Sequence, residues 1–240
     1  MGLYCGYRQK NTANQITGFE AVITTCAVQL PPGYDKAYSE VFAGVNNGDP
    51  LNPKWAQMGY TTYRTLGTPN QQFGLFAEVQ AGPDDDTDYF RAYLGTPGDG
   101  NQGYKGVLDP ATGTWTFYYN GHKIVSFSHP NWVNETTLKA DFVGGVSSDD
   151  VPYAGTSTAP CNFGACALMV GQAFQVVNFQ SGYSQLAQGG TVAPSNMSNA
   201  FAIYNGIGGG AGSGGGGQAV YTGGQTQIDA NQNAIDPSPR

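Results

Sequence analysis

Short runs of apolar, β-branched and aromatic residues alternate along the chain with clusters of glycine, proline, asparagine and aspartate. Such runs predict strands, and the clusters between them predict tight turns. The expected strands cover residues 19–30, 38–45, 54–65, 72–81, 88–94, 103–108, 113–119, 137–147 and 166–179. Because no segment before about residue 180 has the periodicity of an amphipathic helix, the pattern predicts an all-β domain.

The strongest local signal is the segment 115–127, with the sequence WTFYYNGHKIVSF. Two β-prone runs flank Asn120 and Gly121 in this segment. An Asn-Gly pair accepts the positive φ angles that a type I′ turn requires. The segment is therefore expected to form a tight hairpin.

The composition favours strands over helices. Only 11% of the 240 residues are charged, whereas 36 are glycine, 15 are tyrosine and 12 are phenylalanine. Many short strands at this spacing are typical of a two-sheet sandwich or a barrel, which often forms a single domain at this length. The expected organisation is an N-terminal arm over residues 1–18, a β-sandwich over 19–182 and a tail over 183–240.

The tail contains a glycine-rich run at residues 206–217, which buries too little surface to offset its ordering entropy. It is either a flexible linker or a segment that becomes ordered against a partner. The β-prone residues that flank the run suggest that 200–222 pair with an edge strand, of the same domain or of another copy. The second case implies self-assembly. Truncation after Gln180 is expected to leave a folded, soluble monomer.

The formal net charge of −7, with ten Lys and Arg residues in total, argues against nucleic acid or an anionic membrane as partner. No apolar run reaches the ~18 residues of a membrane span. No signal peptide is visible, so either the chain is not secreted or its signal has been removed. We expect a secreted or cell-surface protein, because of its cysteines.

The four cysteines contain no Cys-x-x-Cys pair, which disfavours a zinc site. Cys161 and Cys166 bracket four residues that close a small loop, so these two are expected to form a disulfide. Cys5 and Cys26 would then form the second disulfide and hold the N-terminal arm. The alternative is four buried free thiols.

Candidate chemistry lies on the predicted strands 54–65 and 72–81, which we expect to pair through the intervening turn. Because side chains alternate along a strand, Trp55 and Gln57 share a face. The antiparallel register places Gln57 opposite the region of Glu78 to Gln80. A tryptophan, an amide and a carboxylate would then meet on one sheet surface, unless these are simply polar residues on a solvated face.

Several segments together resemble one family, the glutamic peptidases, or eqolisins, with their neprosin-like relatives. The similarity covers about residues 19–180, and each of its motifs is short. The matching segments are YSEVFAGVNN, KWAQMGYTTYR with its Ala56-Gln57-Met58-Gly59, Phe76 to Gln80, Thr112-Gly113-Thr114-Trp115, Lys139 to Phe142 and Val151 to Ala154. The resemblance implies a concanavalin-like jelly-roll of two antiparallel sheets with a cleft on the concave face.

The resemblance also implies an acid-acting endopeptidase that uses Gln57 and Asp141, with Glu78 as a further candidate. The family places a glutamate where this chain has Asp141, which is one methylene shorter. A general base must lie within ~2.6–3.2 Å of its water, so the shorter side chain can abolish the geometry. If Val146 is instead the equivalent position, the carboxylate is missing altogether.

Two functional classes therefore stand side by side. The first, which we favour, is a non-catalytic extracellular module that binds a glycan or a protein or builds a surface assembly. The second is the endopeptidase. The aromatic residues expected to bind a ligand are Trp55, Tyr60, Tyr93 and Trp132.

Other sites have weaker signals. Asp84, Asp85, Asp86 and Asp88 offer oxygen ligands for calcium, but an acidic turn explains them as well, and no cofactor is otherwise expected. A serine-histidine triad is rejected, because no Gly-x-Ser-x-Gly elbow accompanies the two histidines. The paired carboxylates of sandwich glycosidases are also missing.

Overall fold

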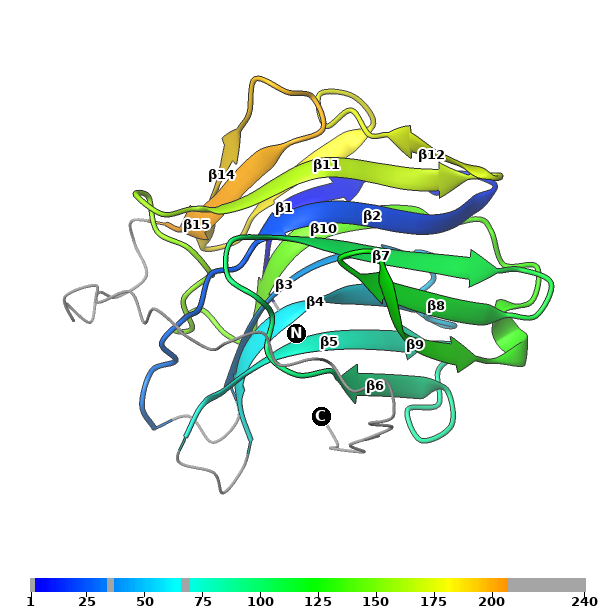
Figure 1. Cartoon of the computed structure of the whole chain (residues 1–240), viewed down its shortest axis with the longest axis horizontal. Coiled ribbons are helices and arrows are strands. Elements are labelled where there is room, and N and C mark those ends of the chain that lie inside the picture. The colour runs from blue at the N-terminus through cyan, green and yellow to red at the C-terminus, as the bar shows by residue number, and fades with distance from the viewer. Residues whose placement is uncertain (1–2, 34–36, 66–69, 207–240) are drawn as a thin grey trace.

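Two antiparallel sheets face each other in the computed structural model, which describes residues 3–33, 37–65 and 70–206 (Figure 1). The seven-stranded sheet has the order β13-β1-β10-β3-β4-β5-β6, and the eight-stranded sheet has the order β14-β15-β11-β2-β7-β8-β9. A further strand, β12, pairs with β11. Within the described ranges the helical structure is one 3₁₀ turn, Pro130–Trp132. The predicted all-β sandwich is confirmed.

The strands of the seven-stranded sheet are β1 (Leu3–Gln9), β3 (Ala37–Asn46), β4 (Trp55–Arg64), β5 (Gln72–Gln80), β6 (Tyr89–Tyr93), β10 (Lys139–Val146) and β13 (Tyr183–Ala187). The strands of the other sheet are β2 (Ile16–Thr24), β7 (Asn101–Asp109), β8 (Thr114–Tyr119), β9 (His122–Ser128), β11 (Cys161–Val170), β14 (Gly190–Pro194) and β15 (Phe201–Asn205), with β12 (Ala173–Val176) beside β11.

The predicted hairpin at Asn120 and Gly121 is present between β8 and β9. Both residues have positive φ, 49° and 82°, and Tyr119 pairs directly with His122. The predicted strand over 166–179 is instead divided at Gly171, whose φ of 65° turns the chain back so that β12 pairs with β11. A positive φ at a glycine is cheap, so this residue ends one strand and begins a hairpin.

The sandwich extends beyond the expected limits of 19–182 at both ends. β1 lies between β10 and β13, inside the seven-stranded sheet, although residues 1–18 were expected to be an arm. β15 lies between β14 and β11 in the other sheet. The expectation that 200–222 pairs with the domain's own edge thus holds for residues 201–205, and residues 207–222 lie outside the described part.

The core lies between the sheets and is rich in aromatic rings. Trp115 packs edge-to-face on Trp132 with ring centroids 5.3 Å apart, and both side chains are fully buried. Tyr60 is also buried, on the core side of β4. Because Tyr60 and Trp132 are closed off from solvent, their assignment as ligand-binding residues was wrong. Rings of this size supply much of the apolar burial that stabilises a core.

All four cysteines are free thiols, so the predicted disulfides were wrong. Cys161 and Cys166 lie on one strand, β11, five residues apart along a chain that is extended except for a bulge at Ala165, which separates them by roughly 10 Å or more. A disulfide requires Cα atoms less than about 7 Å apart. Cys5 packs against Gly190, whereas Cys26 lies beside Cys161.

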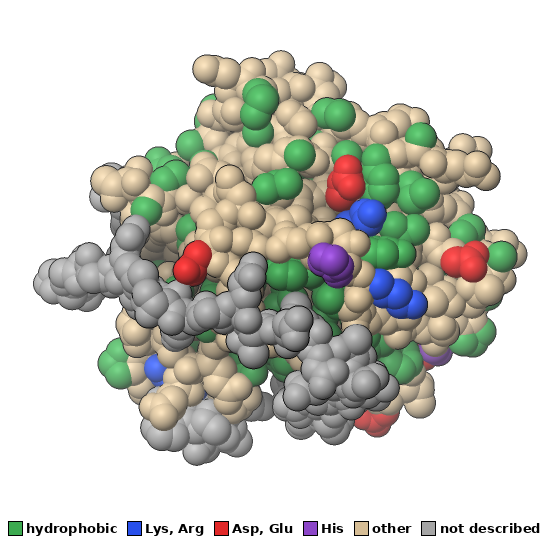
Figure 2. Space-filling view, in the orientation of Figure 1, with side chains coloured by type: hydrophobic (Ala, Val, Ile, Leu, Met, Phe, Trp, Pro, Cys, Tyr) green, Lys and Arg blue, Asp and Glu red, His purple; other side chains and the backbone are tan. Residues whose placement is uncertain are grey.

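The surface carries few charges. The face in Figure 2 shows scattered Lys, Arg, Asp and Glu side chains with no basic patch. A search of the described residues finds no helix that is both long and apolar enough to cross a membrane.

Candidate functional site

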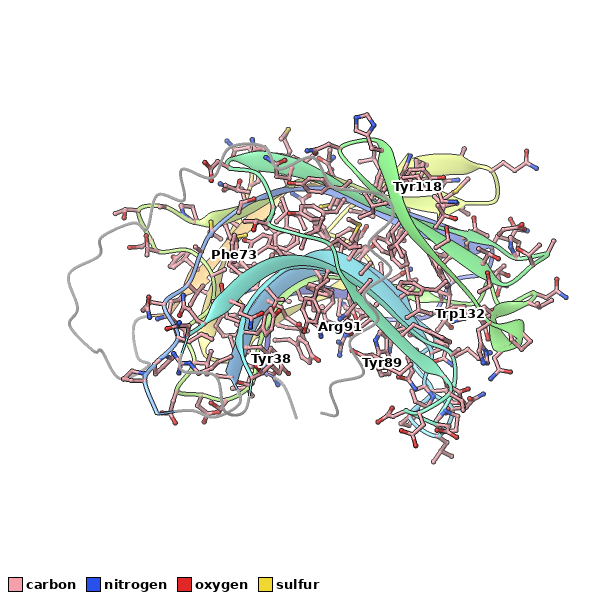
Figure 3. All side chains as sticks on the ribbon, turned by 60° about the horizontal axis from the view of Figure 1, so that its bottom comes forward. Tyr38, Phe73, Tyr89, Arg91, Tyr118 and Trp132 are labelled. Atoms are coloured by element: carbon pink, nitrogen blue, oxygen red, sulfur yellow. The ribbon has the colours of Figure 1, made fainter. Side chains whose placement is uncertain are left out.

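A row of charged and amide side chains crosses the face of the seven-stranded sheet that is turned away from the other sheet. We call this face the concave face, because Figure 3 shows the sheet curving around Tyr38, Arg91 and Tyr89. In-register pairing across six neighbouring strands aligns the positions of the row. The polar row consists of Arg8, Asp141, Gly44, Gln57, Glu78 and Arg91.

The register of β4 and β5 confirms the predicted juxtaposition. Gln57 pairs with Glu78, and its Nε2 donates to Glu78 Oε1 at 2.6 Å. Trp55 Nε1 donates to the same oxygen at 3.1 Å. The tryptophan, the amide and the carboxylate expected on one surface therefore meet there.

Glu78 is completely buried and accepts four hydrogen bonds. In addition to Gln57 and Trp55, Tyr89 Oη donates to Oε2 at 2.8 Å and Arg91 Nη1 donates at 2.9 Å. Although burial opposes its charge, the pKa of Arg91 is raised, because the carboxylates of Glu78 and Glu40 lie close to it. Glu78 and Arg91 thus form a buried ion pair at one end of the row, in which both carboxylate oxygens of Glu78 accept hydrogen bonds.

Asp141 forms the second ion pair of the row. Arg8 donates to it twice, from Nε to Oδ1 at 2.7 Å and from Nη2 to Oδ2 at 3.2 Å. Asn46 Nδ2 donates to Oδ2 at 2.8 Å. Burial nevertheless raises the pKa of Asp141, and the hydrogen bonds and charge of Arg8 oppose this effect.

Gly44 separates Asp141 from Gln57 within the row. A Cβ atom at this position would lie 2.7 Å from Gln57 Cβ and 2.8 Å from the Ala56 carbonyl oxygen. A side chain there would collide with Gln57 and would fill the space between the amide and Asp141. Glycine therefore allows the two candidate catalytic groups to face the same space.

An apolar row lies directly beside the polar row. Phe42, Phe76 and Val143 form a buried cluster on the concave face, against which Tyr4, Tyr93 and Leu186 pack. The Arg91 guanidinium lies over the rings of Phe76 and Tyr93, at 4.5 and 5.0 Å from their centroids. The concave face thus has one polar and one apolar stripe, both running across the strands.

Three buried polar atoms on this face have no hydrogen-bond partner within the described part of the chain. They are Thr61 Oγ1, Gln80 Oε1 and Arg91 Nε. A buried polar atom without a partner costs about 1–3 kcal/mol, and such atoms call for a specific explanation. None of the three atoms is exposed to solvent, so a ligand could reach them only if the side chains of this face moved.

The other predicted site residues are distributed as follows. Trp55 and Tyr93 lie on the concave face, and the Tyr93 ring stacks on Tyr63 at 4.7 Å. Asp84 and Asp88 belong to a turn in which Asp88 faces His129, with 3.3 Å between Oδ1 and Nε2. No group of three or more potential metal ligands occurs within residues 3–33, 37–65 and 70–206.

Arg8, Asn46, Arg91 and Glu40 belong to the site but were not predicted from the sequence. Arg8 was assigned to an N-terminal arm, and no local motif marks the other three. Arg8 and Asn46 reach Asp141 through pairing between strands distant in sequence, as with Arg8 and Asp141, 133 residues apart. Only the sheet order could have revealed these two. Glu40 and Arg91 lie in the consecutive strands β3 to β6, and Arg91 is 13 residues from Glu78, so pairing of neighbouring strands could have revealed them.

The raised pKa of Asp141 predicts how stability changes with pH. A carboxyl group whose pKa is higher in the folded state contributes stability below its unfolded pKa, and loses it as pH rises through the folded pKa. Relative to Asp141→Asn, the free energy of unfolding of the native chain should therefore fall as pH rises through that pKa. Urea titrations of both proteins between pH 3 and 8 measure this, and a parallel pH dependence contradicts it.

These features define a two-sheet β-sandwich protein with a charged, amide-bearing concave face. No family model and no curated protein matches the chain. Among solved structures, it is similar to scytalido-glutamic peptidase bound to a peptide-based transition-state analogue, with 14% identity and a TM-score of 0.56. It is also similar to SCP-B, a member of the eqolisin family of peptidases, in complex with the tripeptide Ala-Ile-His, with 15% identity and a TM-score of 0.52. Each alignment covers 85% of this chain and 98% of the other. At this identity, the comparison confirms the resemblance to the glutamic peptidases as one of fold.

Proposed function

We propose that this protein is a non-catalytic module that binds an extended polypeptide on its concave face. The observation that carries the proposal is that both carboxylates of the polar row are held by arginines. Arg8 engages both oxygens of Asp141, and Arg91 joins three other donors on Glu78. A general acid or base must exchange a proton with its substrate or water, and a carboxylate with every oxygen occupied is poorly placed to do so.

The two stripes of the concave face support a polypeptide as the ligand. An extended peptide presents backbone donors and acceptors together with side chains, which match the polar row and the apolar row respectively. The peptide ligands named for the two similar structures agree with this choice. A secreted or cell-surface setting is part of the proposal.

Acid endopeptidase activity is the second candidate, and one observation favours it. Burial raises the pKa of Asp141, and Gln57 faces the same space across Gly44. A carboxyl with a raised pKa in a site beside an amide is a feature of catalytic centres. In this case, Gln57 and Asp141 would activate water and stabilise the tetrahedral intermediate, and Arg8 would have to release Asp141.

One substrate separates the two candidates. We expect fluorescently labelled casein to bind at pH 7, measured by anisotropy, and to remain intact during incubation at pH 2–5. Gln57→Ala should weaken binding about fivefold, since it removes a hydrogen-bonding group worth about 1 kcal/mol. Thr116→Val, on the outer side of the other sheet, is the matched control and should leave the affinity unchanged.

Two other results would contradict the proposal that the concave face binds a polypeptide. Cleavage of casein at acid pH that is lost in both Gln57→Ala and Asp141→Asn would establish the peptidase and overturn the binding proposal. Failure to bind casein, with retention of the chain on a soluble β-glucan, would identify a glycan as the ligand instead.

A further inference from the structure

Two of the four cysteines, Cys26 and Cys161, lie beside the hydroxyl group of Tyr60. Tyr60 Oη accepts a hydrogen bond from the Cys26 backbone N–H at 3.0 Å and lies 3.1 Å from Cys161 Sγ. Cys161 Sγ lies 3.2 Å from the carbonyl oxygen of Thr24, two residues before Cys26. The Cys26 and Cys161 side chains also lie within interaction range of each other.

The pairing of β2 with β11 brings these cysteines together. Phe163 of β11 pairs with Ile23 of β2, and the strands are antiparallel. Continuation by two residues brings Cys161 beside the segment that carries Cys26. The backbone thus holds the two cysteines near each other, and a disulfide requires such nearness.

We propose that Cys26 and Cys161 form a redox-active thiol pair that closes to a disulfide by exchange with a low-molecular-weight disulfide such as oxidised glutathione. The Cys26 thiolate attacks one glutathione sulfur, which forms a mixed disulfide and releases the first glutathione as its thiolate. Cys161 then loses its proton and attacks the Cys26 sulfur, which releases the second glutathione. The protein is oxidised by two electrons, and one oxidised glutathione is reduced to two thiols.

The burial and the pKa of each thiol determine which of the two cysteines attacks glutathione first. Cys26 is half-buried and Cys161 is fully buried. The hydrogen bond from Cys161 lowers the pKa of the Cys26 thiol, whereas burial raises the pKa of Cys161. The thiolate is the reactive form, so Cys26 is the first nucleophile. Burial raises the pKa of Cys5 to about 12 and also raises that of Cys166, which makes these two inert internal controls.

The experiment uses the full-length protein, equilibrated with oxidised and reduced glutathione, alkylated and mapped without reductant. We expect one cross-linked peptide, Cys26 with Cys161, with Cys5 and Cys166 alkylated only after unfolding. The cross-link closes a loop from residue 26 to residue 161, so oxidation should raise the melting temperature by about 10 °C. Cys26→Ser should abolish both the cross-link and the shift, and Cys5→Ser should keep both.

Other results would overturn the proposal. A cross-link between Cys161 and Cys166, or between Cys5 and Cys26, would place the pair elsewhere. A stable mixed disulfide of glutathione on Cys26 without a cross-link would show that Cys161 cannot complete the exchange. Should Cys26→Ser fold poorly, Cys161→Ser should accumulate that mixed disulfide on Cys26; full protection of Cys26 there would also contradict the proposal.

Discussion

Replacement of Glu78 by alanine should lower the free energy of unfolding by about 3–5 kcal/mol, the cost of removing one partner of a buried ion pair. The Glu78 side chain is 1% exposed and that of Arg91 is 15% exposed, so water cannot replace the lost carboxylate readily. The substitution also deprives Gln57, Trp55 and Tyr89 of their common acceptor. Chemical denaturation monitored by tryptophan fluorescence measures the effect.

Two further variants serve as controls for Glu78→Ala. Glu78→Gln keeps the shape but not the charge, so it should recover only part of the loss. Glu20→Ala removes a less buried carboxylate, paired in register with Lys105, and should cost less than about 1 kcal/mol. Equal losses for Glu78→Ala and Glu20→Ala would mean that the polar row contributes no special stability.

Truncation after Gln180 should abolish cooperative folding, whereas truncation after Gly206 should leave a protein that melts within about 3 °C of the full chain. The shorter variant loses β13, β14 and β15, and with them the buried Phe201 and Ile203. Burial of each such side chain contributes about 1.5–3 kcal/mol, and a domain has only about 5–15 kcal/mol in all. The structure therefore reverses the expectation that residues 1–180 form a stable monomer.

The expected loss of cooperative folding rests on the aromatic packing of Phe201 in β15. Phe201 stacks on Phe163 with centroids 4.5 Å apart and contacts Phe179 and Tyr7 edge-to-face. Differential scanning calorimetry and near-ultraviolet circular dichroism would report the loss of this packing. A cooperative transition in the variant ending at Gln180 would show instead that the last three strands are accessory.

The sequence alone determined the features that depend on neighbouring residues. Runs of apolar, β-branched and aromatic residues, bounded by clusters of glycine, proline, asparagine and aspartate, predicted most strands of both sheets, because such runs favour extended chain and such clusters favour turns. Asn120 and Gly121 predicted the hairpin, because few other residue pairs accept two positive φ angles. The short connection between β4 and β5 also brought Gln57 opposite Glu78.

The tertiary structure decided what depends on strand order. Arg8 reaches Asp141 only because β1 pairs with β10, and Cys26 reaches Cys161 only because β2 pairs with β11. No local pattern encodes such pairings. The backbone N–H and C=O groups along a strand edge can pair with any other strand of suitable length whose apolar side chains point to the same side. Tyr60 is a similar case. Its position along the strand decides on which face of the sheet it lies, but the packing of the other sheet decides that this face is buried. The Arg8–Asp141 ion pair and the thiol pair are therefore consequences of topology.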